Sequence, residues 1–201
     1  MTRLAAALVM LLLPVLAAAA PKAESDWPCQ QLLVPELTAG MVWDGPSLEG
    51  LGDWHKEPSV AALVQRAAPE DVSAADGEAV IAQFLHDLSG DRTRLVSLAF
   101  AGLLDETNRT RTEVIQRIKD LAERQRNLAR LISRLTAELD ATPATAQGDA
   151  AQAHAELEQR WTFTTRSYDE VQRTMRYACE VPVTLDARLG DYARALEAAL
   201  H

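Results

Sequence analysis

The side chains best suited to catalysis or metal binding are scattered along this sequence. The four histidines are His55, His86, His154 and His201. None of them belongs to an H-x-x-x-H, E-x-x-H or H-E-x-x-H pattern, so helical zinc and di-iron sites have no support. Asp53, His55 and Glu57 alternate on a polar segment and have donor atoms that suit a metal, but three such donors are common by chance. We therefore predict no metal site.

Patterns for covalent catalysis, nucleotide binding and haem attachment are also missing. The segment Gly45–Glu49 does not fit G-x-S-x-G and follows no strand pattern. There is no glycine-rich phosphate loop, and Lys22, Lys56 and Lys119 leave few candidates for a Schiff base. We expect a protein that is not an enzyme and has no cofactor. A nucleophile and a base that only folding brings together is the alternative, because spacing cannot reveal it.

The amino terminus has the organisation of a signal peptide. A positively charged start precedes an apolar run, Leu4–Leu16, and the small residues Ala17–Ala20 suit signal peptidase. Because Pro21 disfavours cleavage after Ala20, we place the cut after Ala19. An uncleaved membrane anchor is the alternative, but the run is shorter than the ~20 apolar residues of a membrane span. We expect a periplasmic or secreted protein with no stable membrane insertion after cleavage.

That location gives meaning to the two cysteines, Cys29 and Cys179. Two cysteines in an oxidising compartment most often pair with each other. A disulfide between them would close a loop of about 150 residues and stabilise the fold by roughly 5 kcal/mol in the chain-entropy model. Free thiols and an intermolecular bond are the alternatives. A redox-active pair is not expected, because there is no C-x-x-C pattern.

Composition and charge favour an ordered helical protein. Hydrophobic residues make up 48% and charged residues 24%, which excludes global disorder, and the low aromatic share of 5% favours helix over sheet. The net charge of −9 argues against nucleic-acid binding. The segment Arg109–Arg134 is nevertheless basic, because its eight basic residues face only three acidic ones, Glu113, Asp120 and Glu123. Such a separation of basic from acidic residues can serve a partner. Alternatively, the oppositely charged parts of the chain neutralise each other within the fold or across a dimer.

Hydrophobic periodicity predicts five helices and no strands. Their expected ranges are Ser59–Ala67, Ser73–Gly90, Arg92–Ala141, Asp149–Ala178 and Thr184–Leu200. Ser73 with Asp76 predicts an N-cap, and Thr142–Gly148 predicts a tight turn between the two longest helices. Glu180-Val181-Pro182 is expected to break the chain between the last two helices.

The two longest helices carry apolar stripes with alternating spacings of four and three, which is typical of a coiled coil. The first stripe contains Val114, Ile118, Leu121, Gln125, Leu128, Ile132, Leu135 and Leu139. The second contains Leu157, Trp161, Thr164, Tyr168, Val171 and Met175. The first falters at Thr107 and Arg111, which leaves open whether this helix is continuous or kinked near residues 107–112. Folding back of the second helix would bring Cys179 level with Arg111.

The predicted fold is all-α, with a helical bundle head and a long antiparallel two-helix coiled-coil hairpin. We predict one domain after the signal peptide of residues 1–19. Within residues 20–201, a tryptophan-containing strap covers 20–58, the head covers 59–110 and 179–201, and the hairpin stalk covers 111–178 with its tip near Ala144.

The stalk is the best candidate for binding a protein partner or a second copy in a homodimer. Its predicted contact residues are Arg117, Arg124, Arg126, Arg130, Leu131 and Phe163. A solvated face whose charges neutralise one another is the alternative. A second hypothesis is a pocket for a small ligand under the strap, lined by Trp27, Trp43 and Trp54, although large aromatic residues also pack in cores.

Two short segments are familiar: Asp26-Trp27-Pro28-Cys29, and Tyr177–Val183 with the sequence YACEVPV. They resemble the two ends of a group of small, uncharacterised exported proteins of Gram-negative bacteria that have a helical middle. The resemblance implies a periplasmic location and supports pairing of the cysteines. It implies no activity and transfers no functional residue.

Overall fold

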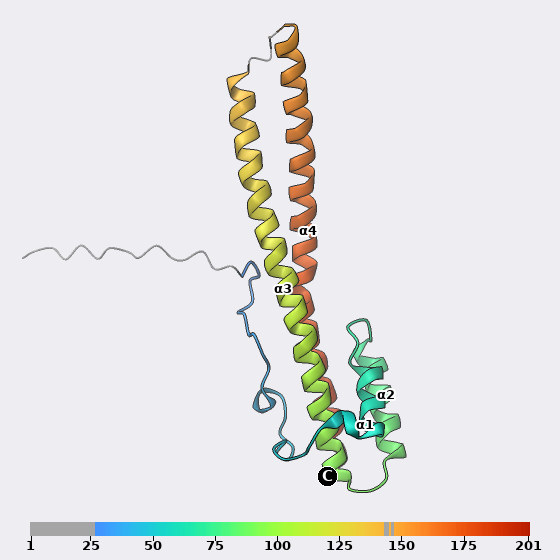
Figure 1. Cartoon of the computed structure of the whole chain (residues 1–201). Coiled ribbons are helices and arrows are strands. Elements are labelled where there is room, and N and C mark those ends of the chain that lie inside the picture. Colours follow the sequence, from blue (N-terminus) through green and yellow to red (C-terminus); the bar gives the residue numbers. More distant parts are fainter. Residues whose placement is uncertain (1–26, 143–144, 146) are drawn as a thin grey trace, which may run out of the picture.

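Two long antiparallel helices form the axis of the molecule. The computed structural model describes residues 27–142, 145 and 147–201, so the predicted signal peptide and the expected tip at Ala144 lie outside the described residues. The long helices are α3 (Arg92–Ala141) and α4 (Asp149–Glu197), and they form a helical hairpin (Figure 1). No strand occurs in the described ranges, so the predicted all-α hairpin fold is confirmed.

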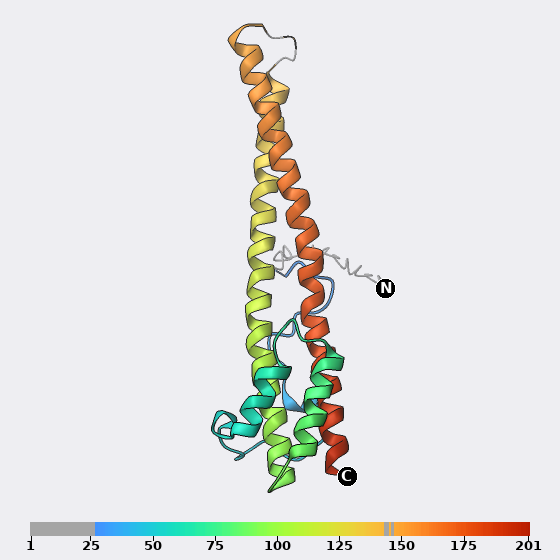
Figure 2. The ribbon, with the colours of Figure 1, turned by 90° about the vertical axis from the view of Figure 1, so that its right-hand side faces the viewer.

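The shorter elements surround one end of the hairpin. They are the helices α1 (Pro58–Ala67) and α2 (Ala74–Asp87) and the 3-10 turns η1 (Ala39–Met41), η2 (Trp54–Lys56) and η3 (Ala198–Leu200). We call residues 27–57 the strap. Figures 1 and 2 show α1 and α2 on one side of the helix pair and the strap on another. The opposite half of the hairpin extends beyond all of these elements.

The ends of the helices follow local signals in the sequence. Pro58 is the first residue of α1, where its missing N–H costs no helical hydrogen bond. The predicted cap of α2 is confirmed, because the Ser73 side chain accepts a hydrogen bond from the Asp76 amide. α2 ends at Asp87, before the expected end at Gly90.

The expected break at Pro182 is wrong, because α4 runs without interruption from Asp149 to Glu197. Proline lacks an N–H and usually disrupts a helix interior. Here side chains from elsewhere bond to the backbone beside the proline: Arg111 donates to the carbonyl of Pro182, and Gln31 donates to the carbonyl of Cys179. The predicted helices Asp149–Ala178 and Thr184–Leu200 are therefore one helix that ends in η3.

α3 is equally continuous through residues 107–112, where the sequence left a kink open. Thr107 and Arg111 interrupt the apolar stripe but are buried. The Asp186 side chain of α4 bonds to Arg111, and nearer the tip the Trp161 indole donates to the Thr136 hydroxyl. This register corrects the expectation that Cys179 lies level with Arg111, because the residues opposite Arg111 are one to two turns further along α4.

Arg188 and Tyr192 of α4 hold the end of α1 and the loop that follows it. The buried Arg188 guanidinium donates to the carbonyls of Ala68, Pro69 and Val72 at 2.7 to 2.8 Å. The Tyr192 hydroxyl donates to the Ala67 carbonyl at 3.1 Å. A cation suits this place because the last carbonyls of a helix carry partial negative charge.

The strap lies along α3 and is attached to it at several levels. The Trp43 ring stacks on Phe100 with 4.3 Å between the ring centroids. The Asn108 side chain accepts a hydrogen bond from the Leu37 amide and donates one to the Leu37 carbonyl, both at 2.9 Å. The Asn108 side chain therefore satisfies both the N–H and the C=O of Leu37, which have no strand among the described residues to pair with.

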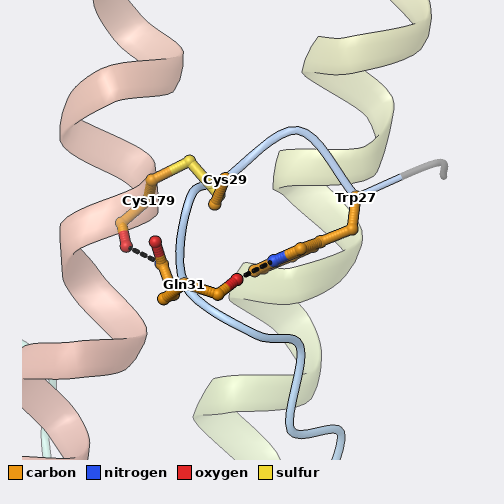
Figure 3. Close-up of a disulfide and its surroundings, with 4 residues drawn as sticks. All are labelled: Trp27, Cys29, Gln31 and Cys179. Atoms are coloured by element: carbon orange, nitrogen blue, oxygen red, sulfur yellow. Dashed lines mark hydrogen bonds between the residues drawn. A yellow bond between two sulfur atoms is a disulfide. The ribbon is translucent and has the colours of Figure 1, made fainter.

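The predicted disulfide between Cys29 and Cys179 is confirmed and joins the start of the strap to α4. Figure 3 shows that the strap curls back at this point, so that the Trp27 indole donates to the Gln31 carbonyl at 2.7 Å. The Gln31 side chain in turn donates to the Cys179 carbonyl. The disulfide thus lies within a small network that fixes the strap on α4.

Arg111 connects the three segments that meet below the disulfide. Its side chain is only 2% exposed and donates to the carbonyl of Val34 in the strap and to the carbonyl of Pro182 in α4, as well as to Asp186. Burial raises the pKa of Asp186, and the Arg111 guanidinium works against that shift. The ion pair with Asp186 therefore contributes little to the stability of the fold. The bonds to the two carbonyls give Arg111 its structural role.

The contact between α2 and α4 predicts opposite effects for two glycine substitutions. A Cβ at Gly77 would overlap the Tyr192 hydroxyl, whereas a Cβ at Gly190 would come no closer than 3.5 Å to the Arg194 side chain. We expect Gly77→Ala to lower the free energy of unfolding by about 1–3 kcal/mol through overpacking. Gly190→Ala should raise it by about 0.5–1 kcal/mol, because alanine favours helix. Urea unfolding followed by circular dichroism measures both values, and equal losses would contradict the described packing.

The Arg111 cluster predicts a second asymmetry. Arg111→Met leaves two carbonyls and a carboxylate without their donor and should cost about 3–5 kcal/mol of stability. Asp186→Asn keeps an acceptor oxygen at a half-exposed position and should cost about 1 kcal/mol or less. The same urea titration compares them, and a loss for Asp186→Asn as large as that for Arg111→Met would show that the ion pair dominates.

The pKa of Asp186 adds a pH dependence to this comparison. Because its folded pKa lies above the ordinary value of 3.8, protonation favours the folded state. This contribution is fully present below pH 3.8 and is lost as the pH rises through the folded pKa. Relative to Asp186→Asn, the natural chain should therefore gain stability on acidification through that range. A relative loss would mean that the pKa is lowered instead.

Candidate interaction surface on the hairpin

The three tryptophans of the strap do not form one pocket. Trp43 is buried, and its indole donates to the Pro46 carbonyl at 2.8 Å. The half-buried Trp54 indole donates to the Asp105 side chain at 3.1 Å. Trp27 borders a hollow of about 130 Å³ beside Arg111, which neither of the other two tryptophans lines. Trp43 and Trp54 contact α3, whereas the Trp27 indole donates to the Gln31 carbonyl within the strap, so the geometry gives the small-ligand hypothesis no common site.

A larger hollow of about 710 Å³ lies beside the disulfide, between the strap and the two long helices. Glutamine side chains from all three segments line it: Gln30, Gln31, Gln125 and Gln172. No tryptophan lines this hollow. Among the described residues there is also no group of three His, Cys, Asp or Glu side chains placed to hold a metal ion.

The outer half of the hairpin consists of α3 and α4 alone (Figure 1). Two packed helices can bury only the side chains that lie directly between them. Leu135 is such a side chain and is 1% exposed, whereas Phe163 is 67% exposed. Leu128, Leu131, Ile132 and Leu157 are only half-buried. The outer hairpin therefore presents more apolar surface than the pairing of its two helices uses.

Two contacts with the head show which side of the hairpin carries Phe163. The Arg117 guanidinium of α3 lies 3.1 Å from the Glu70 carboxylate in the loop between α1 and α2. On α4, Tyr177 borders a hollow that Glu70 also lines. Both residues therefore lie on the side of the helix pair that faces this loop. Figure 2 is viewed from the side on which α1 and α2 lie.

Residues spaced by seven share one face of a paired helix, so the two contacts define the same side further up the hairpin. On α3 the series from Arg117 continues with Arg124, Leu131 and Glu138. On α4 the series from Tyr177 continues with Glu170, Phe163 and Glu156. Among the residues that follow Arg117 and Tyr177 in these two series, Leu131 is half-buried and all the others are exposed.

The register of the hairpin places Leu131 and Phe163 at nearly the same level. Thr136 and Trp161 are bonded across the helix pair, and both Leu131 and Phe163 lie on the head side of that contact. At 1.5 Å per residue their levels differ by less than about one helical turn. We call the surface formed by Arg124, Leu131, Glu138 and Phe163 the central face.

The structure divides the predicted partner-binding residues. Arg124, Leu131 and Phe163 share the central face, whereas Arg117 is already paired with Glu70. Arg130 is exposed and donates to Asn127, and its place in the heptad puts it on the side of α3 away from α4. Arg126 is half-buried and lies two residues from Arg124, toward the opposite side of the hairpin.

No protein-family model, no curated protein and no solved structure matches this chain. Within the described residues, no helix combines the length and the apolar content that a membrane span requires. The geometry of the central face is therefore the basis for the proposals below.

Sequence reasoning missed Glu138 as a member of the site. The signal was available, because Glu138 continues the spacing of seven that begins at Arg117 and Arg124. The predicted set consists of basic and apolar residues, and Glu138 has the opposite charge at the same heptad position.

The difference in burial predicts a difference in stability between two apolar residues of the outer hairpin. Leu135→Ala should lower the free energy of unfolding by about 2–5 kcal/mol, because it removes a buried side chain. Phe163→Ala should change it by about 0.5 kcal/mol or less, as expected for an exposed position. Thermal unfolding at low micromolar protein concentration compares the two. A large loss for Phe163→Ala would show that this ring packs within the single chain.

Proposed function

We propose that this chain is a non-catalytic periplasmic interaction protein that acts through its helical hairpin. The observation that carries the proposal is the exposed Phe163 ring on a part of the hairpin that no other described element covers. Large aromatic residues are enriched at protein interfaces, where they supply much of the binding free energy. The cross-linked head then fixes the direction in which the hairpin projects.

The periplasmic location in this proposal rests on two supports. The disulfide between Cys29 and Cys179 is the kind of bond that persists in oxidising compartments. The expected signal peptide would direct the chain there. An interaction role also accords with the central face, whose exposed charges flank an apolar centre in the way that a polar rim surrounds an interface core.

A photoreactive phenylalanine analogue in place of Phe163 tests this function. In cells that produce the full chain, the analogue should form a covalent adduct with another polypeptide upon irradiation, because the ring is expected to be buried in the contact. The matched control places the analogue at Ala137, an exposed position on the side of α3 away from α4. Equal adduct yields at both positions, or none at residue 163, would reject the hairpin as an interaction element.

A further inference from the structure

The charges of the central face are arranged symmetrically about its apolar centre. On α3, Arg124 lies seven residues before Leu131 and Glu138 lies seven residues after it. Opposite charges are thus equally distant from one midpoint on the same face of one helix. A second α3 that ran antiparallel across this midpoint would bring Arg124 of each copy against Glu138 of the other.

We propose that the occupant of the central face is a second copy of this chain, bound antiparallel about a two-fold axis that passes Leu131 and Phe163. The inference rests on the proposed function and names the partner of that surface. The axis lies in the interface and runs across the hairpin, so each α3 packs on the α3 of the other copy and each α4 on the other α4. The two Leu131 side chains meet at the centre, as do the two Phe163 rings.

The free length of the hairpin fits this arrangement. From Leu131 toward the tip, α3 has ten more residues to its end at Ala141, which is about 15 Å. From Leu131 toward the head, fourteen residues separate it from Arg117, where the loop between α1 and α2 begins to cover the hairpin. That distance is about 21 Å. The end of α3 of a second copy therefore falls short of the head. On α4, Asp149 and Tyr177 are both fourteen residues from Phe163, so α4 of a second copy would begin level with Tyr177, where the head begins.

The extent of the overlap indicates a weak dimer. About 20 residues of each hairpin would overlap, and a helix pair is about 20 Å wide, so each copy would bury about 600 Å². The two copies together would bury about 1,200 Å², which lies at the lower end of specific protein–protein interfaces. We expect a reversible dimer whose affinity falls with increasing salt, since its charged pairs are exposed at the edges of the contact.

One feature of α4 opposes the dimer and gives a test of its register. Glu156 and Glu170 lie seven residues on either side of Phe163, so the axis would bring Glu156 of one copy near Glu170 of the other. Like charges at this distance reduce affinity. Glu170→Lys would convert both contacts into opposite pairs and should therefore tighten the dimer by a few fold.

Charge reversal on α3 supplies the decisive experiment. Arg124→Glu and Glu138→Arg should each weaken self-association about tenfold, since each reverses both charged contacts of the dimer. Neither variant should change helicity, because both side chains are exposed. An equimolar mixture of the two variants should form a heterodimer of nearly natural affinity, because every Arg–Glu contact becomes complementary again.

Sedimentation velocity over a range of concentrations at low salt measures these affinities, and native mass spectrometry identifies the heterodimer. The matched control is Arg130→Glu, which changes the net charge as Arg124→Glu does but lies outside the central face, and it should leave the affinity unchanged. A natural chain that stays monomeric, or a mixture that does not recover, would overturn the antiparallel dimer. A Phe163 adduct with a different protein would also overturn it while leaving the proposed function standing.

Discussion

The buried Arg111 guanidinium is the constraint on which the rest of the structure depends. It occupies a position in the stripe of α3 where an apolar residue would let the two long helices pack directly, and a buried cation is costly unless acceptors surround it. Its two terminal nitrogens are bonded, whereas its buried Nε has no acceptor among the described residues. The Val34 carbonyl of the strap and the Pro182 carbonyl of α4 provide acceptors. The strap can therefore be neither shifted nor removed without leaving a buried charge with fewer partners. The disulfide nearby links the same two segments covalently.

A proline lies inside α4 close to this constraint. A proline removes one helical hydrogen bond and crowds the preceding turn, so it is unfavourable in a helix interior. Pro182 takes the helical donor from the Ala178 carbonyl, whereas Gln31 donates to the next carbonyl, that of Cys179, and Arg111 donates to the carbonyl of Pro182 itself. These bonds hold α4 on both sides of the proline, and the helix continues to Arg188 and Tyr192, which hold the end of α1 and the loop after it. A break at this point would separate the disulfide from the part of α4 that organises the head.

Local patterns in the sequence predicted the elements of this fold better than their connections. The stripes of α3 and α4, the cap at Ser73 and the pairing of Cys29 with Cys179 follow from spacing and residue type, and the structure confirms them. The continuity of α4 through Pro182 could not be predicted, because a proline locally favours a break and the contacts that hold both sides of this one come from the distant residues Gln31 and Arg111. For the same reason, Arg111 was interpreted as a fault in the stripe, although it is a buried tie between segments.

The candidate site shows the same division between spacing and three-dimensional placement. The sequence predicts Arg124, Leu131 and Phe163 as contact residues outside the two apolar stripes, but spacing alone does not show which side of the hairpin each occupies. That assignment needed the contact of Arg117 with Glu70 and the position of Tyr177 beside the same loop.

The place of the head also limits how the hairpin can associate. A parallel arrangement about an axis along the hairpin would place α3 of one copy on α4 of the other at the same level. Glu138 would then lie near Glu156 and Arg124 near Glu170, so the charges alone do not separate the two arrangements. However, α1 and α2 lie on the same side of the helix pair as the central face, so the heads of two parallel copies would meet at the same level. The antiparallel arrangement instead moves each acidic tip onto the basic segment around Arg124. Its like-charge contacts include those of Glu156 with Glu170, whose exposed side chains are screened by solvent. The place of the head on this side of the hairpin therefore favours the antiparallel arrangement, and the exposed ring of Phe163 lies where its axis must pass.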